Sequence, residues 1–373
     1  MIVERHQAAV ERGEPILEID LGKIRANYRL LRQFYRGKIV SAVVKTDAYG
    51  LGIEPVVGAL AREGCDHFWV ANLSEASRVR AKAPEAVVFS LHGLQTQPPR
   101  RFVGEGVIPV LASLGEVEAC AALARATGAP VPVAIQLDTG LGRMGLQEAD
   151  CARLAADPSL LAGLEIRAWT THLAAFDDPD APSNREQRER LMRWTGPLPS
   201  APISLAASSG VFMSNDWHFD IARAGSALYG VQASQIRQDG LAVTYCLKAP
   251  VLRIATMPAG SFLGYRGATR LERDSIIATL GIGYGNGLPQ GFGQVGMIAC
   301  GEWRAKPVGG VSMNLVMADI TDLPADSVEV GQMAVLLGDG QTVDDLAAAL
   351  GCAPNAILTQ IGTATSRVYR NQS

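Results

Sequence analysis

Several residues that can donate, accept or hold a proton stand directly after short apolar runs of this sequence. Lys45 ends the run KIVSAVVK (38–45) and is followed by a Gly-rich turn, TDAYGLG. Apolar surroundings disfavour the charged ammonium group of a lysine, so they lower its pKa and make its nucleophilic amine accessible. Such an amine can form a Schiff base with a carbonyl compound. A lysine at a strand end can also simply extend its charged group into solvent, and both interpretations stay open for the lysine taken alone.

The other residues that can do chemistry also follow apolar runs. They are Asp138, Arg143, His172, Ser208, Ser209 and Arg223. In a closed barrel of parallel strands the carboxyl ends of all strands meet at one face, which carries catalytic residues and, near strands 7 and 8, phosphate sites. A barrel would therefore bring these side chains together.

The stretch from residue 38 to residue 225 has the pattern that such a barrel requires. Its β-branched apolar runs lie at 38–45, 67–72, 86–93, 107–113, 131–138, 164–172, 202–208 and 219–225. Between several of them lie Ala-, Leu-, Glu- and Arg-rich stretches with helical spacing, at 53–64, 74–83, 114–128 and 185–194. Near-continuous apolar strands alternating with amphipathic helices indicate a parallel sheet buried on both faces. Eight such units fit a closed (β/α)8 barrel better than an open doubly wound sheet.

The pattern changes after Gly230. The segment 231–240 is polar and turn-prone, and the short apolar runs beyond it are separated by Gly and Pro, which is typical of antiparallel β structure. One helix is expected at 342–350, because Thr342 can cap it and Asp345 can complete the capping box. We therefore predict a barrel domain over 1–237, with a short N-terminal extension, and a mainly β domain over 238–373.

Composition and charge narrow the classes of function. The chain has 373 residues, of which 48% are hydrophobic and 19% charged, as in globular proteins with more than one domain. The net charge of −3, with no long basic run, argues against nucleic acid as a partner and favours a small substrate.

The N-terminus, the lengths of the apolar runs and the cysteine spacing indicate where the protein is located and whether it binds a metal. The N-terminus lacks the apolar core of a secretory signal, and no apolar run approaches the ~18 residues of a membrane span. The six cysteines are scattered without metal-ligand spacing, which is typical of reduced thiols. We expect a cytoplasmic protein without a metal site or a membrane partner.

The sequence around Lys45, VVKTDAYGLG (43–52), resembles the cofactor-lysine signature of alanine racemases. Six further blocks resemble that family in the same order: LDTGLGRMG, TTHLA, FDIARAGSALYG, GYRGAT, GYGNG and VGGVSMNLVMADIT. Each block alone is a weak signal, but the ordered series spans nearly the whole chain. The resemblance implies a barrel that binds pyridoxal 5'-phosphate (PLP), a β domain, and a homodimer with shared active sites that interconverts L- and D-alanine.

The resemblance also implies two bases. Lys45 would hold PLP as a Schiff base and take the α-proton of the D-amino acid, and Tyr265 of the partner subunit would take that of the L-enantiomer. Two bases are needed because the proton leaves one face of a planar carbanion and arrives at the other. An unperturbed tyrosine is a poor base at neutral pH, so His172 and Arg223 would form a network that supports it.

Further roles follow from the same resemblance. Arg223 would face the pyridine nitrogen of PLP, and because it keeps its proton it would limit electron withdrawal into the ring. The implied cofactor-binding residues are Lys45, Tyr49, His172, Ser209, Arg223, Gly225 and Ser226. The substrate carboxylate would be held by the guanidinium of Arg143 and the backbone of Met313.

Several positions depart from the family's pattern. Gln136 stands where many relatives have a lysine that can be carbamylated, so its amide oxygen must hold Arg143 directly or not at all. Asn355 stands where a phosphate-binding tyrosine is usual. The other departures, which mostly remove charge, are Leu51, Asn286, Gln290 and Asn314, whereas Asp177 and Tyr284 match the family's entrance corridor. We therefore hypothesise that the substrate range or the cofactor affinity differs from that of a typical alanine racemase.

Three alternatives stay open. The chain can be a racemase of another amino acid, such as serine or lysine. It can be a barrel-type PLP decarboxylase or aldolase, which would not need Tyr265 as a base. It can also be a PLP-holding or regulatory protein without turnover.

Overall fold

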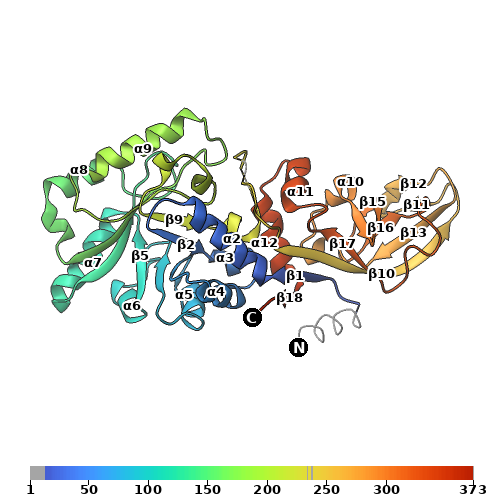
Figure 1. Ribbon diagram of the computed structural model, residues 1–373, viewed down its shortest axis with the longest axis horizontal. Helices are drawn as coiled ribbons and strands as arrows, with labels where there is room; N and C mark the ends of the chain where they lie inside the picture. Colours follow the sequence, from blue (N-terminus) through green and yellow to red (C-terminus); the bar gives the residue numbers. More distant parts are fainter. Residues whose placement is uncertain (1–12, 233, 237, 373) are drawn as a thin grey trace. The chain divides into compact units, whose positions relative to one another are not determined.

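The computed structural model describes residues 13–372 apart from residues 233 and 237. Its chain forms two compact units (Figure 1). The barrel unit comprises Arg25–Ala48 and Ile53–Leu241. Within the described residues, the β unit comprises residues 13–24, the short segment Tyr49–Gly52 and residues 242–372. The division at residue 237 that the sequence suggests stays a prediction.

Eight parallel strands form the barrel unit, in the order β8-β7-β6-β5-β4-β3-β2-β9. Their bounds are β2 (Ile39–Val43), β3 (His67–Val70), β4 (Val87–Ser90), β5 (Val107–Leu111), β6 (Val131–Gln136), β7 (Leu164–Thr170), β8 (Ile203–Ser204) and β9 (Ile221–Ala224). The first and last strands of this order meet through a parallel bridge between Ala207 and Arg223 and a hydrogen bond from Arg223 N to Ala206 O of 2.8 Å. Each strand lies within one of the predicted apolar runs, so the predicted (β/α)8 barrel is confirmed.

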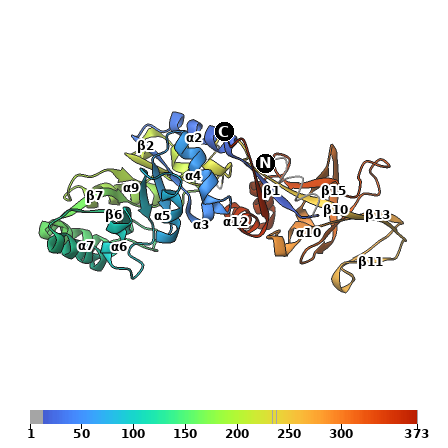
Figure 2. The same ribbon diagram turned by 90° about the horizontal axis from the view of Figure 1, so that it is seen from below.

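The helices of this unit lie on the outside of its strands (Figures 1 and 2). They are α2 (Leu21–Phe34, which begins before the unit's first residue), α4 (Ile53–Arg62), α5 (Leu73–Arg80), α6 (Pro99–Gly104), α7 (Leu114–Thr127), α8 (Glu148–Ala156) and α9 (Pro182–Thr195). Two of them begin with the same kind of cap. The Asn72 side chain accepts from Glu75 N at the start of α5, and the Ser113 side chain accepts from Glu116 N at the start of α7. Such caps satisfy N–H groups that the first helical turn leaves unpaired.

Large side chains fill the core of the barrel unit. Trp69 and Phe89 are fully buried and stack with ring centroids 4.1 Å apart. The Trp69 indole donates to Ser41 Oγ at 2.7 Å, so its buried polar group is satisfied. Full burial of one such large apolar side chain contributes roughly 1.5–3 kcal/mol. This packing gives a rigid support for residues at the strand ends.

The β unit is built on a mainly antiparallel sheet with the order β13-β16-β15-β14-β17-β10-β1-β18. Its strands are β1 (Ile16–Asp20), β10 (Tyr245–Met257), β13 (Ser275–Leu280), β14 (Ile298–Cys300), β15 (Trp303–Val311), β16 (Val316–Asp319), β17 (Met333–Leu337) and β18 (Ser366–Arg370). A separate hairpin pairs β11 (Phe262–Leu263) with β12 (Thr269–Arg270). The predicted mainly β C-terminal domain is confirmed. The strands β1 and β18, which lie at one end of this sheet, were not predicted.

Over the residues that the structure describes, three α-helices complete the β unit: α10 (Phe292–Val295), α11 (Val343–Leu350) and α12 (Pro354–Ala364). The predicted cap of α11 is confirmed, because Thr342 Oγ1 accepts from Asp345 N at 3.1 Å and Asp345 Oδ2 accepts from Thr342 N at 2.8 Å. In the part of the chain that the structure describes, no helix has both the length and the apolar character needed to cross a membrane. The six cysteines are unpaired, and four of them are buried: Cys65, Cys120, Cys151 and Cys300.

Candidate active site

The strand ends of the barrel unit carry most of the residues that the sequence singles out. Lys45 follows β2, Arg143 lies in the loop after β6, and His172 follows β7. Ser208 and Ser209 follow β8, and Arg223 lies in β9, next to its end. Because the strands are parallel neighbours, these residues share the carboxyl-end face.

Lys45 is held where its charged form is disfavoured. Burial is the largest cause that lowers the pKa of its ammonium group, and the positive charges of Arg143 and Arg223 lower it further. The carboxylate of Glu75 acts in the opposite direction. A lysine with a lowered pKa has more free amine at neutral pH, which is the form that attacks a carbonyl group.

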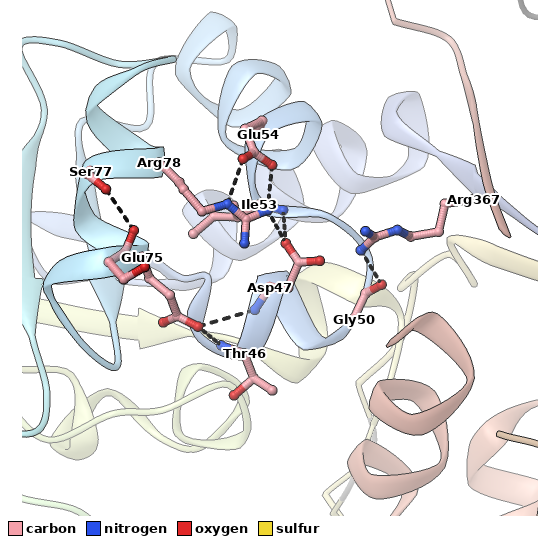
Figure 3. A network of polar contacts seen from close by, with 10 residues as sticks. Thr46, Asp47, Gly50, Ile53, Glu54, Glu75, Ser77, Arg78 and Arg367 are labelled. Atoms are coloured by element: carbon pink, nitrogen blue, oxygen red, sulfur yellow. Dashed lines mark hydrogen bonds and ion pairs between the residues drawn. The ribbon is translucent and has the colours of Figure 1, made fainter. Parts of the chain in front are cut away.

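The backbone directly after Lys45 is unusual. Thr46, Asp47, Ala48 and Tyr49 all have φ between 54° and 58°, so four consecutive residues other than glycine adopt the left-handed conformation. Figure 3 shows this turn and the polar contacts around it. For L-residues this conformation costs about 1–2 kcal/mol per residue, so the surroundings must hold it. Within the turn, Ala48 N donates to Val44 O at 2.9 Å.

Arg223 is buried, and its guanidinium is hydrogen-bonded to neighbouring strand ends. Its guanidinium donates to Ser204 Oγ at 2.6 Å, Ser204 O at 2.9 Å and Thr171 O at 2.6 Å. It also lies 3.4 Å from His172 Nδ1. Burial lowers the pKa of Arg223 to about 10, so it remains a cation at neutral pH. The contacts with the strand-end carbonyl groups fix the plane of the guanidinium.

His172 is the neutral member of this pair. Its burial, followed by the charges of Arg223, Arg143 and Lys45, lowers the pKa of its imidazole to about 3. The positive charge beside these strand ends therefore comes from the arginines rather than from the histidine.

We expect the imidazole of His172 to stay neutral from pH 8 down to pH 5. Because its pKa in the unfolded chain is near 6.5, the unfolded state takes up a proton below that pH and the folded state does not. The free energy of unfolding should therefore fall as the pH falls from 6.5 towards 3, by less than about 1.4 kcal/mol per pH unit from this residue. A His172→Gln variant should show a shallower fall in urea titrations, and an imidazole signal that titrates near pH 6.5 would contradict the assignment.

Two short turns after β8 and β9 are tied together by one hydroxyl group. Ser208 Oγ accepts from Gly225 N at 2.9 Å and from Ala227 N at 3.2 Å. Ser209 begins a short helical turn, the 3-10 helix η2 (Ser209–Phe212), and Ser226 begins another, η4 (Ser226–Tyr229). Ser209 is buried and Ser226 is half-buried. The structure thus brings both serines and Gly225 close together at the strand ends.

Arg143 is positioned through its backbone. The Asp138 carboxylate accepts from Gly140 N, Gly142 N and Arg143 N, at 3.1, 2.9 and 3.0 Å. The side chain of Arg143 is exposed and lines a cavity of about 520 Å³. Three hydrogen bonds to one carboxylate give this glycine-rich loop a defined shape.

Gln136 does not hold Arg143 through its amide oxygen. That oxygen accepts from Thr170 Oγ1 at 2.6 Å, and the amide nitrogen donates to Leu137 O at 3.3 Å. The sequence left two options for Gln136: its amide oxygen either holds Arg143 or does not. The structure shows the second option, because this oxygen is hydrogen-bonded to Thr170. Asn355, in α12, has a buried Oδ1 with no hydrogen-bond partner in the described part of the chain.

Besides Tyr49, which belongs to the segment Tyr49–Gly52, two of the predicted site residues lie in the β unit. Tyr265 is 77% exposed, in the 3-10 turn η5 (Tyr265–Gly267) between β11 and β12, and Met313 is 56% exposed, between β15 and β16. The turn before Tyr265 rests on β15, since a Cβ at Gly264 would lie 1.9 Å from Gly309 O. Met313 O accepts from Gly285 N at 2.7 Å. Both side chains therefore project from a turn whose backbone is fixed by close packing.

Tyr49 is the last residue of the left-handed turn. It is half-buried, and burial raises the pKa of its phenol to about 12. The phenol is therefore protonated at neutral pH and can donate a hydrogen bond to an anion.

Two residues that organise the strand ends, Glu75 and Ser204, were not singled out from the sequence, and Ser208 was singled out without the contacts that its side chain makes. Their partners are backbone groups in other loops or a distant guanidinium, which no local pattern reveals. The one usable signal was the spacing of Asn72 and Glu75, which is that of a helix capping box.

Comparisons with known proteins agree with this geometry. The family described as "Alanine racemase, N-terminal domain" matches residues 19–233, and "Alanine racemase, C-terminal domain" matches residues 244–369. An alanine racemase of Acidiphilium cryptum is 38% identical over 365 residues, which cover 96% of this chain and 99% of the relative. A catabolic alanine racemase of Agrobacterium fabrum is 35% identical, with 99% and 95% covered.

Solved structures agree as well. A crystal structure of alanine racemase from Bartonella henselae, with covalently bound pyridoxal phosphate, is 32% identical and superposes with a TM-score of 0.91. The match covers 96% of this chain and 99% of that one. Two family models that together span most of the sequence, and relatives that match it nearly end to end, lead to one conclusion. This chain belongs to the alanine racemase family.

Proposed function

We propose that this chain is a PLP-dependent racemase that interconverts L- and D-alanine, with Lys45 and Tyr265 as its two bases. The observation that carries the proposal is Lys45 itself. It stands at the carboxyl end of β2 with a lowered pKa, on the same face as Arg223, His172 and the serine turns after β8 and β9.

The donor set at this face fits PLP. The amine of Lys45 suits its aldehyde, and the buried cation of Arg223 suits its ring nitrogen. The hydroxyl groups of Ser209 and Ser226, the backbone of Gly225 and the protonated phenol of Tyr49 suit its phosphate. The covalently bound pyridoxal phosphate of the Bartonella henselae enzyme supports this assignment.

Bound PLP would act as an electron sink that makes the α-proton of an amino acid acidic. The chain's own residues supply the rest. Lys45, as the free amine, takes and returns the proton on one face of the α-carbon. Arg143 holds the carboxylate of the substrate, because a guanidinium matches a carboxylate with two parallel hydrogen bonds. Met313 assists through its backbone.

Tyr265 acts on the other face, from the partner subunit of a homodimer. In support, its side chain is largely exposed within its own chain. The apolar side chains of Phe262, Met313 and Leu315 are also exposed on the β unit, at 66%, 56% and 41%. Aromatic residues and methionine are enriched at protein interfaces. The two active sites of the dimer would then share residues.

Alanine is the proposed substrate, and serine, lysine or another amino acid is the alternative that the changed entrance residues allow. We further propose a cytoplasmic enzyme for D-alanine biosynthesis, with no nucleic acid or membrane as partner. One relative is named as catabolic, so the direction of flux stays a prediction.

The proposal is tested by incubating the purified chain and PLP with L-alanine, L-serine and L-lysine in D2O. We expect absorbance near 420 nm from bound PLP, both alanine enantiomers by chiral chromatography, and deuterium at the α-carbon without loss of carbon. Loss of CO2 or of a side-chain fragment would instead identify a decarboxylase or aldolase. Bound PLP with no exchange at the α-carbon of any of the three would identify a PLP-holding protein.

A further inference from the structure

The left-handed turn after Lys45 needs an external clamp, and Glu75 provides one. Glu75 Oε1 accepts from Thr46 N at 2.6 Å and from Asp47 N at 3.3 Å (Figure 3). Its other oxygen, Oε2, accepts from Ala71 N at 2.8 Å. One carboxylate thus joins the end of β3 to the first two amides after the reactive lysine.

The direction of these amides matters. In this left-handed turn the N–H groups of Thr46 and Asp47 converge on one oxygen of Glu75, as consecutive backbone amides do in an anion-binding turn. Neutral side chains bind such a pair of donors less strongly than a carboxylate does. Glu75 is therefore matched both in charge and in position to the strained turn.

A second group of side chains holds the far end of the same turn. Asp47 Oδ1 accepts from Ile53 N at 2.9 Å and from Arg78 Nη2 at 2.6 Å, and Arg78 also donates twice to Glu54 at 2.6 Å. These side chains are 26–37% exposed, so water partly screens their attraction. Their contacts reach the side chain of Asp47, while Glu75 binds the amide next to Lys45 itself.

A second glutamate of the barrel unit makes the same kind of contacts with backbone amides, but in a loop that has no lysine. Glu116 Oε2 accepts from Ala112 N at 2.7 Å, and its Oε1 accepts from Leu94 N at 2.8 Å. The loop that it holds also has left-handed residues, Gln95 and Thr96, with φ of 49° and 65°. Glu116 therefore does for the loop after β4 what Glu75 does for the loop after β2, which makes it a matched control.

We propose that Glu75 is a positioning residue for Lys45, because its carboxylate holds the left-handed turn that fixes where the lysine amine lies. This inference rests on the proposed role of Lys45. Glu75 acts through the backbone and does not touch the reacting atoms. Its negative charge also raises the pKa of Lys45 against the effect of burial and of Arg143 and Arg223, so its loss should change the pH at which the amine becomes free.

The test is a Glu75→Gln variant, which keeps the size of the side chain and replaces one acceptor oxygen by a donor. We expect faster hydrogen–deuterium exchange at the amides of Thr46 and Asp47. We expect PLP to dissociate at least about tenfold more readily, and kcat for alanine to fall about 10²-fold, as for a misplaced reactive group. KM should change less than about threefold, because the carboxylate-binding Arg143 lies in another loop.

Two further variants separate positioning from general stability. Glu116→Gln should lower the thermal midpoint to a similar extent but leave PLP retention and exchange at Thr46 unchanged. Because Glu116 also borders the cavity beside Arg143, only the cofactor and exchange measurements are compared for it. Thr46→Gly in the Glu75→Gln background should recover much of the lost PLP affinity, since glycine adopts the left-handed conformation without strain and the Thr46 side chain is exposed.

Equal loss of PLP from Glu75→Gln and Glu116→Gln, or unchanged amide exchange at Thr46 and Asp47 in Glu75→Gln, would overturn the inference. If Glu75→Gln does not fold, Glu75→Asp takes its place, with a carboxylate too short to reach both Ala71 N and Thr46 N. Failure of the proposed function itself gives a different result. The unmodified protein would then bind no PLP, while amide exchange would still report whether Glu75 holds the turn.

Discussion

Replacing Lys45 by alanine is expected to lower the racemisation rate by at least about 10⁴-fold, since it removes both a general base and the amine that would bind the cofactor. The variant should also lose covalent attachment of PLP. Borohydride reduction followed by mass spectrometry measures this directly, because it fixes PLP on the lysine of the unmodified protein and should fix none at this position in Lys45→Ala. Rates of D-alanine formation from L-alanine give the loss of activity.

Lys38 offers a matched control at the other end of the same strand. Its side chain is 80% exposed and pairs with Asp220 at 3.0 Å, so Lys38→Ala removes a lysine without touching the strand-end face. We expect this variant to keep PLP and activity within about twofold, as for most surface substitutions. A Lys45→Ala protein that still carries reducible PLP on another lysine would show that the cofactor attachment has been assigned to the wrong residue.

The barrel could be predicted because its strands are buried on both faces. Val40 and Ala42 on one face of β2 and Val43 on the other are all buried, so β2 has a near-continuous apolar sequence that can be located from the sequence alone. The position of each run also predicted the position of each functional residue, since parallel strands end at one face. The prediction for β8 was less accurate, because the predicted run 202–208 contains a regular strand of only two residues.

The strand β1 could not be found in the same way. Its sequence, ILEID, contains Glu18, which is only 5% exposed and would argue against a buried strand. The structure neutralises this charge with Lys248 and Arg370, at 2.9 and 2.6 Å. Both partners are far along the chain, so only the folded sheet reveals why a glutamate is tolerated there.

In the candidate site, too, some features could be predicted from the sequence and others could not. Lys45, Arg143, His172 and Arg223 were visible because their types and positions relative to strands are unusual. The contacts that orient them were not visible, because Glu75 and Ser208 act by accepting hydrogen bonds from backbone groups of neighbouring loops. A sequence shows which residues can react, but the backbone conformation that requires an acceptor, such as the left-handed turn after Lys45, appears only in three dimensions.

Replacing Tyr265 by phenylalanine is expected to slow racemisation by about 10²–10⁴-fold, the usual contribution of one general base. The effect should differ between enantiomers. D-alanine should still exchange its α-proton with D2O, because Lys45 can remove and return a proton on the same face, whereas L-alanine should exchange hardly at all. Tyr369→Phe, in β18 of the same unit, is the control and should leave both exchange rates unchanged. Full turnover by Tyr265→Phe would favour the alternative that the chain is a decarboxylase or an aldolase.

A heterodimer tests whether Tyr265 acts across the interface. In a dimer of one Lys45→Ala chain and one Tyr265→Phe chain, one site would combine both substitutions, and the other would combine an intact Lys45 with an intact Tyr265 of the partner subunit. Co-expression with two different affinity tags isolates this species, and we expect about half of the unmodified dimer's activity from its one complete site. Each homodimeric variant alone should be nearly inactive. If the two bases instead belonged to the same chain, each chain of the heterodimer would lack one of them, and the mixed dimer would be as inactive as its parents.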